Sequence, residues 1–199
     1  MDLDRRLSLM PMLGIMASQI SGHLWAPNGA YDSIATGTGN GTSSTITFSS
    51  IPQTYTHLQV RILGRSTAVA QTDYIYCWIN GDTTTSKYAY HYLRGDGTTA
   101  TAGGSAASTS AYAGFANASS ATAGMFGVSV IDILDYTNTN KYRTTRSLSG
   151  EDRNTVGGNV WYFSNLFMDS TAVTSLQLKM VGGNWDTNSH VALYGIKGV

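Results

Sequence analysis

Hydrophobic and polar residues alternate along much of the chain after residue 44. Because successive side chains of a β-strand point to opposite faces, this period of two predicts strands with one face in a core. The segments that show it are 45–49, 57–62, 73–79, 88–94, 125–134, 142–148, 160–167, 173–181 and 191–197. No segment after residue 24 has the 3.6-residue period of an ordinary helix. The pattern therefore predicts an all-β domain of about nine strands.

Glycine, proline and asparagine mark the ends of these segments. Asn80-Gly81 is a strong signal for a hairpin turn, and Pro52 ends the first strand because proline cannot donate to a ladder. Residues 98–124 are mostly small (TTATAGGSAASTSAYAGFANASSATAG), so we expect a long exposed loop, or a loop with one weak strand. Around Val130 and Ile131 the apolar phase shifts, which indicates either a bulge or a strand covered on both faces.

The spacing of strands and turns fits two antiparallel sheets packed face to face. We therefore predict a single jelly-roll-like antiparallel β-sandwich over residues 25–199, preceded by an extended N-terminal arm over residues 1–24. A length of 199 residues suits one such domain. A chain of this size loses roughly 70% of its unfolded surface on folding, which is enough to bury a core.

The first 24 residues carry an apolar run, LSLMPMLGIMASQI, after Arg5 and Arg6. This arrangement resembles a secretory signal peptide, but Asp2 and Asp4 dilute the positive start and Pro11 interrupts the apolar run. The run is also too short for a membrane span, which needs about 20 residues. We favour an arm that docks on a neighbouring subunit. The apolar residues expected to make that contact are Leu7, Leu9, Met10, Met12, Leu13 and Ile15.

Charged residues make up only 12% of the chain, and the formal net charge is zero. About 25% is usual for soluble domains, so the exterior must be neutral and polar. Because copies of such a protein repel each other little, we favour a protein that is packed against other subunits; the alternative is an isolated neutral domain. Without a basic excess, phosphate-driven nucleic-acid binding has no electrostatic basis. The single cysteine, Cys77, excludes an internal disulfide; it alternates with Ile75 and Ile79, so we predict that it is buried.

No combination of residues predicts an active site, a metal site or a cofactor. The four histidines lack metal-ligand spacing, no motif pairs two carboxylates, and no serine lies in a G-x-S-x-G setting. Asp82 and Asp96 follow glycines in predicted turns, where an aspartate side chain bonds nearby backbone amides. Arg94-Gly95-Asp96 spells the tripeptide that integrins recognise, but three residues recur by chance too easily to support a role in adhesion.

Aromatic residues are the remaining candidates for contact with a ligand or partner. Exposed rings beside Asn and Asp in loops are a means by which β-sandwiches stack sugars. Trp185, between Asn184 and Asp186, fits this arrangement best, and the alternatives for it are contact with a glycan or partner and ordinary packing. Trp78 and Trp161 lie within predicted strands, where core or interface positions are expected.

Four segments together resemble a widespread module of tailed-bacteriophage virion proteins. They are residues 46–61 (ITFSSIPQTYTHLQVR), 78–97 (WINGDTTTSKYAYHYLRGDG), 130–144 (VIDILDYTNTNKYRT) and 175–197 (SLQLKMVGGNWDTNSHVALYGIK). The likeness covers roughly residues 30–199, and MPMLGIMASQISG before it resembles the leader of stand-alone versions. Such modules occur alone and at the ends of tail-fibre-like proteins, and the resemblance brings no catalytic residues with it.

The resemblance implies a non-enzymatic structural protein on the outer surface of a phage particle, attached to other capsid or tail proteins. A capsid decoration or cement subunit anchored by its arm is the first hypothesis, since the chain is small and shows no fibrous stalk. The alternative is a small tail or tail-fibre adhesin that binds a host-surface glycan. A depolymerase would need two carboxylates about 5–10 Å apart in a groove. We expect a homo-oligomer, for which a trimer would suit, with no cofactor and no nucleic acid or membrane among its partners.

Overall fold

The computed structural model describes residues 30–154 and 157–197. The docking arm predicted over residues 1–24, with its contact residues from Leu7 to Ile15, lies outside the described residues and stays a prediction. The described part of the chain contains twelve strands. They are β1 (Tyr31–Thr38), β2 (Thr45–Phe48), β3 (His57–Gly64), β4 (Thr72–Ile79), β5 (Tyr88–Gly95), β6 (Ala100–Ser108), β7 (Ala111–Asn117), β8 (Gly127–Ile133), β9 (Arg143–Asp152), β10 (Gly158–Phe167), β11 (Leu176–Met180) and β12 (His190–Ile196).

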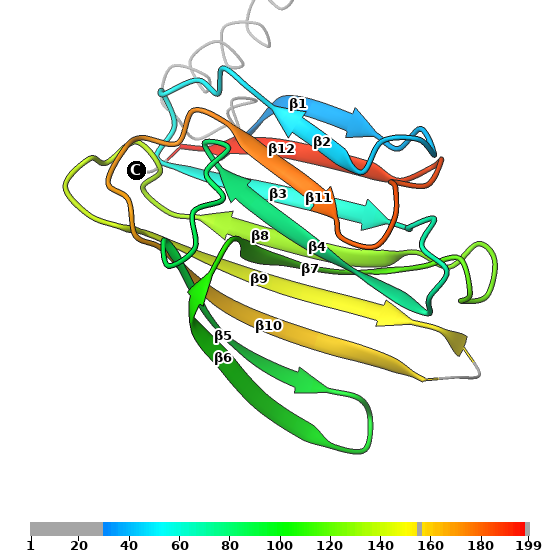
Figure 1. The fold of residues 1–199 in the computed structure, drawn as a ribbon. Helices are drawn as coiled ribbons and strands as arrows, with labels where there is room; N and C mark the ends of the chain where they lie inside the picture. Colours follow the sequence, from blue (N-terminus) through cyan, green and yellow to red (C-terminus); the bar gives the residue numbers. More distant parts are fainter. Residues whose placement is uncertain (1–29, 155–156, 198–199) are drawn as a thin grey trace, which may run out of the picture. The chain divides into compact units, whose positions relative to one another are not determined.

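The strands form two antiparallel sheets that pack face to face as a sandwich (Figure 1). The large sheet has eight strands in the order β1-β12-β3-β8-β9-β10-β5-β6, and the small sheet has four in the order β2-β11-β4-β7. The quartet β1-β12-β3-β8 thus faces the quartet β2-β11-β4-β7. Along these eight strands the chain changes sheet at every step except from β4 to β7, which is the connectivity of a jelly roll. The predicted jelly-roll-like β-sandwich is confirmed.

Two hairpins enlarge the large sheet beyond these eight strands. β5 and β6 follow β4 in the chain, and β9 and β10 follow β8. All four strands join the large sheet at the β8 side, so the sheet continues past β7, the last strand of the small sheet (Figure 1). The inner face of β10 and β5 therefore extends beyond the region that the small sheet covers.

Three strands lie outside the nine segments in which strands were predicted. β1 falls within residues 25–44, and β6 and β7 fall within residues 98–124. The small residues of β6 have low strand propensity, but they fit a crowded pairing with β5. A Cβ atom at Gly103 would lie 2.8 Å from the Tyr92 ring. Pairing with neighbouring strands thus outweighs the weak local preference of this segment.

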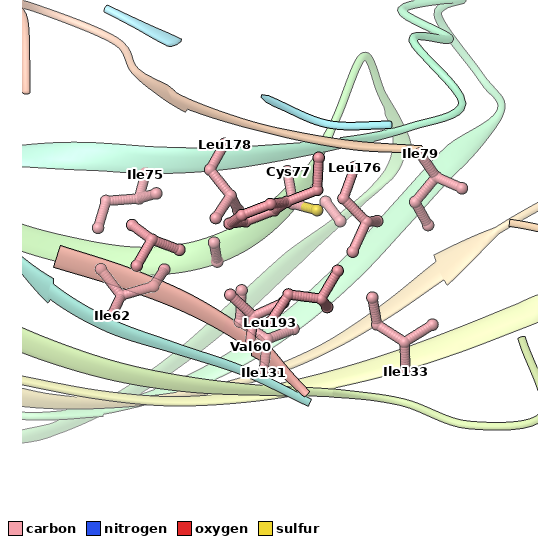
Figure 2. Close-up of a cluster of buried hydrophobic side chains, with 14 of the residues drawn as sticks. Val60, Ile62, Ile75, Cys77, Ile79, Ile131, Ile133, Leu176, Leu178 and Leu193 are labelled. Carbon is pink, nitrogen blue, oxygen red and sulfur yellow. The ribbon is translucent and has the colours of Figure 1, made fainter. Parts of the chain in front are cut away.

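The core lies between the two sheets and is mainly aliphatic (Figure 2). Ile75, Cys77 and Ile79 of β4 lie in this cluster with Leu176 and Leu178 of β11. The large sheet contributes Val60, Ile62, Ile131, Ile133 and Leu193. Cys77 is buried as predicted, and burial raises the pKa of its thiol to about 12. The thiol is therefore protonated at neutral pH and inert as a nucleophile.

The inner face of β9 is polar. The buried residues of this strand are Arg143, Thr145, Ser147, Ser149 and Glu151. Two of them bond the free edge of β7: the Phe115 backbone N–H donates to Ser149 Oγ at 3.0 Å, and the Ser147 hydroxyl donates to the Tyr112 carbonyl oxygen at 3.0 Å. These bonds give partners to backbone groups of β7 that would otherwise be free to pair with an added strand. Leu148 points outward and is exposed.

Both predicted explanations of the phase shift around Val130 and Ile131 are wrong, since β8 has neither a bulge nor a cover on both faces. β8 pairs with β3 and with β9 in unbroken register. Ile131 and Ile133 point into the core, whereas Val128 and Val130 point outward and are exposed. The outer face of this strand is apolar without being covered.

Lys87 joins two turns through its ammonium group. Its Nζ lies 2.6 Å from Asp82 Oδ2 and 2.9 Å from Asp169 Oδ2. Asp169 also accepts hydrogen bonds from the backbone N–H and the hydroxyl of Thr171, each at 2.8 Å. The backbone N–H of Thr171 and then Lys87 lower the pKa of Asp169 to about 2.

A carboxyl whose pKa is lower in the folded than in the unfolded chain stabilises the fold above its ordinary pKa, and this contribution is lost as the pH falls. We therefore expect Asp169→Asn to lower the free energy of unfolding at pH 7 by about 1 kcal/mol, less than the full linkage value because water reaches the ion pair. The variant should also lose less stability than wild type as the pH falls from about 4 toward about 2. Urea denaturation across this range measures both effects, and equal acid sensitivity of the two proteins would contradict the assignment.

Candidate binding surfaces

Trp185, the residue predicted to contact a ligand, is fully buried. Its indole N–H donates to the Leu178 carbonyl oxygen at 3.3 Å, and its backbone N–H donates to the Ser43 carbonyl oxygen at 2.9 Å. A ring without exposed surface cannot stack against a sugar. The expectation that Trp185 faces a glycan or partner is therefore wrong, and the alternative of ordinary packing holds.

Asn184 and Asp186, which flank Trp185, connect loops within the fold. The Asn184 backbone N–H donates to Thr67 Oγ1 at 3.0 Å. Asp186 Oδ2 lies 3.5 Å from Arg65 Nε. Asn184 and Asp186 are half-buried, and their role as contact residues stays a prediction.

The Arg94-Gly95-Asp96 tripeptide stabilises the turn between β5 and β6. Asp96 accepts hydrogen bonds from the backbone N–H groups of Thr98 and Thr99, at 3.0 and 2.8 Å. These bonds, that of Thr99 first, lower the pKa of Asp96 to about 2. The prediction that this aspartate bonds the backbone of its turn is confirmed, and Arg94 lies 3.5 Å from the same carboxylate.

Seven large apolar residues lie together on the outer face of the large sheet. We call this set the outer band; it consists of Leu63, Leu93, Val128, Val130, Leu148, Val160 and Tyr162. Strand register makes it continuous, since Tyr162 lies opposite Leu148 on β9 and opposite Leu93 on β5, and Val130 lies opposite Leu148 on β8. Each of the seven residues is between 37% and 59% exposed. Monomeric proteins rarely expose a contiguous apolar patch of this extent unless it is an interaction surface.

Glycines hollow the outer band into a groove. Two adjoining depressions of about 520 and 250 Å³ share Val128, Gly150 and Val160 in their walls. A Cβ atom added at Gly150 or at Gly95 would meet no atom within 4 Å, so the space above these glycines is open. The groove therefore has room for side chains of another protein segment.

A second feature lies on the inner face of the large sheet, where β10 and β5 extend past the small sheet (Figure 1). Seven aromatic residues line a hollow of about 180 Å³ there, which we call the aromatic cleft. They are Tyr74 of β4, Tyr90 and Tyr92 of β5, Tyr112 and Phe115 of β7, and Trp161 and Phe163 of β10. Phe115 and Phe163 are buried, whereas the other five rings keep exposed surface.

Four rings of the aromatic cleft, those of Tyr112, Phe115, Trp161 and Phe163, stack nearly parallel, whereas Tyr74, Tyr90 and Tyr92 are tilted against them. The planes of Trp161 and Phe163 differ by 7°, and those of Tyr112 and Phe163 by 9°. Phe115 stacks on Trp161 with ring centroids 4.3 Å apart. The buried phenylalanines therefore form a floor that fixes the orientation of the exposed rings.

A β-bulge in β7 brings two of these rings to the same face. Tyr112 and Phe115 are three residues apart, so regular alternation would place them on opposite faces of the strand. Their partners on β4, Tyr76 and Tyr74, are two residues apart, so one residue of β7 is extra. Gly114, within the bulge, has a φ of 145°, which favours glycine.

Polar side chains border the aromatic cleft beside Trp161. The Arg94 guanidinium lies 5.3 Å from the centre of the Trp161 ring, and its Nε–H donates to Asn159 Oδ1 at 2.7 Å. The Asn159 amide donates in turn to the Glu151 carboxylate, which also lies 3.1 Å from Arg153 Nε. Burial raises the pKa of Glu151.

Sequence reasoning singled out one tryptophan and did not predict either surface, although a signal for each was present. Tyr90 and Tyr92 alternate within one predicted strand, and Trp161 and Phe163 alternate within another. Pairing of these two strands places four rings on a common face. For the outer band, the signal was a strand with apolar residues in both phases, around Val130.

Comparison with known proteins gives no family for this chain. No protein-family model matches it, and no curated protein matches it. Within residues 30–154 and 157–197, no three His, Cys, Asp or Glu side chains gather where they could hold one metal ion. In the same ranges no helix is long and apolar enough to cross a membrane. The class of protein is thus defined by its fold and its two surfaces: a jelly-roll sandwich with an apolar outer band and an aromatic cleft.

Proposed function

We propose that this chain is a non-enzymatic structural protein on the outer surface of a bacteriophage particle, a capsid decoration or cement subunit anchored by its apolar N-terminal arm. The observation that carries the proposal is the outer band, an apolar face on a sandwich with only 12% charged residues. Such a face suits a protein that works while packed against other virion proteins or other copies of itself. The resemblance of four segments to phage virion modules supports the same role.

The free energy gained by burying the outer band is too small to hold the protein on a particle without the arm. Each of its residues is about half exposed, so burying one against a partner contributes roughly 1 kcal/mol, or about 7 kcal/mol for the band as a whole. Association costs on the order of 4–15 kcal/mol in lost freedom of motion. The outer band alone would therefore bind weakly. Six further apolar residues of the arm, Leu7 to Ile15, would supply the missing contact.

Deleting residues 1–22 should leave the sandwich folded but unable to attach to phage particles from which the protein has been stripped. Leu148→Lys, in the centre of the outer band, should weaken attachment by about tenfold or more. Thr144→Lys, on the same outer face of β9 but outside the outer band, is the matched control and should attach like wild type. Cosedimentation with particles measures all three. Retained attachment of the truncated protein would refute the role of the arm, and unchanged attachment of Leu148→Lys would refute that of the outer band.

A small tail or tail-fibre adhesin that binds a host-surface glycan is the second candidate function. The aromatic cleft favours it, because exposed rings on a rigid floor are suited to sugar stacking. The two candidates are compatible with one fold, since the outer band and the aromatic cleft lie on opposite faces of the large sheet.

A further inference from the structure

We propose that the aromatic cleft binds one neutral pyranose residue of a glycan. This proposal specifies where the adhesin of the second candidate function would bind its ligand and to which chemical class that ligand belongs. It rests on the second candidate function only in taking the glycan to come from a host surface. It does not depend on the attachment role of the outer band.

The size of the aromatic cleft limits the ligand to a single ring. Its volume of about 180 Å³ is below the range of about 300–1,000 Å³ that is typical for drug-sized ligands. A longer saccharide would place one residue in the cleft and leave its neighbours in solvent. Recognition of one sugar residue is weak, so useful adhesion would require several copies of the protein acting together.

The chemistry of the cleft matches the two kinds of surface on a sugar ring. The C–H groups on the face of a pyranose pack on aromatic faces. Of the residues that line the cleft, Tyr74 is exposed, and Tyr92 and Trp161 are half-buried. The hydroxyl groups around the rim of a pyranose need hydrogen-bond partners, which phenol groups and Arg94 can supply. Tyrosine and tryptophan lose little freedom on binding because they are already stiff.

The charges beside the cleft favour a neutral sugar over an acidic one. Arg94 lies 3.5 Å from Asp96, and Arg153 lies 3.1 Å from Glu151. The Arg94 guanidinium beside Trp161 is therefore already paired with a carboxylate, as is Arg153, so neither of these two cations is left unpaired to neutralise a uronate. The same carboxylates are engaged within the fold: Glu151 accepts from Asn159, and Asp96 bonds the turn. This supports binding of the glycan without its cleavage.

The test is titration of the full-length protein with methyl pyranosides of glucose, mannose and galactose, and with methyl glucuronide as the acidic counterpart. Tryptophan fluorescence and ligand-observed NMR monitor binding during the titration. Wild type should bind at least one neutral pyranoside and bind the glucuronide at least about tenfold more weakly. Trp161→Ala should weaken binding by at least about tenfold. Trp78→Ala, which removes a half-buried tryptophan outside the cleft, is the matched control and should bind like wild type.

A second variant keeps the proposal testable if Trp161→Ala does not fold. Gly103→Ala would place a Cβ atom 2.8 Å from the Tyr92 ring and push the ring into the aromatic cleft, with every aromatic residue retained. It should reduce binding as well. Absence of binding to all neutral pyranosides, preference for the glucuronide, or equal binding by Trp161→Ala and wild type would overturn the proposal. Attachment of Trp161→Ala to stripped particles, measured in parallel, separates this outcome from failure of the structural role.

Discussion

Replacing Trp185 with alanine should destabilise the sandwich by about 3–5 kcal/mol and lower its melting temperature by roughly 10 °C. The whole indole is buried, so its removal leaves a large cavity in the core. The ring packs closely on β3, since a Cβ atom at Gly64 would lie 3.2 Å from its Cζ3. The substitution also removes the donor that satisfies the Leu178 carbonyl oxygen.

Thermal and urea denaturation measure this effect, with Trp78→Ala as the comparison. Trp78 is half-buried on the outer face of β4, so its truncation should cost clearly less than that of Trp185. Trp185→Phe keeps most of the buried volume and should fall between wild type and Trp185→Ala. A stable Trp185→Ala protein with altered ligand binding would show that the ring is a contact residue and not part of the core.

The strands that the sequence predicts best carry large aliphatic residues in one phase. β3, β4 and β11 are of this kind, and their inward residues form the core as expected. The burial of Trp185 was not predictable in the same way, because GGNWDTN has the composition of an exposed turn. Its burial depends on a β-bridge to Ser66, far away in the sequence.

β6 and β9 illustrate two other limits of sequence reasoning. β6 is built from alanine, glycine, serine and threonine, so its pattern has no apolar phase to detect. In β9 the buried phase is polar because Ser147 and Ser149 bond the edge of β7, and the exposed phase contains Leu148. In β9 the usual association of apolar with buried residues is thus reversed, because this strand faces an edge and not a sheet face.

The aromatic cleft could be predicted only in part. Alternation of tyrosines in β5 and of Trp161 with Phe163 in β10 indicates a shared aromatic face once the two strands are paired. The contribution of β7 requires knowledge of the bulge at Gly114, and the pattern A-Y-A-G-F-A does not reveal it. Gly114 is therefore the residue on which the shape of the aromatic cleft depends most strongly.

Gly114→Ala should destabilise the protein by about 3 kcal/mol, because it combines backbone strain with overpacking. The φ of 145° at this position disfavours any residue with a side chain. An added Cβ atom would lie 2.6 Å from Ser149 Oγ and closer still to Ser129 Oγ, the two hydroxyls that bond each other beneath the bulge. To relieve this contact β7 would have to shift, and the rings on either side of Gly114 would lose their common face.

Gly150→Ala is the matched control, since a Cβ atom there would meet no atom within 4 Å. It should change the free energy of unfolding by no more than about 0.5 kcal/mol. Urea denaturation gives the stability difference, and near-ultraviolet circular dichroism reports on the order of the stacked rings. Gly114→Ala should lose aromatic signal at urea concentrations where its strands are still folded, whereas Gly150→Ala should not. Equal stability and equal spectra of the two variants would mean that the bulge does not set the geometry of the aromatic cleft.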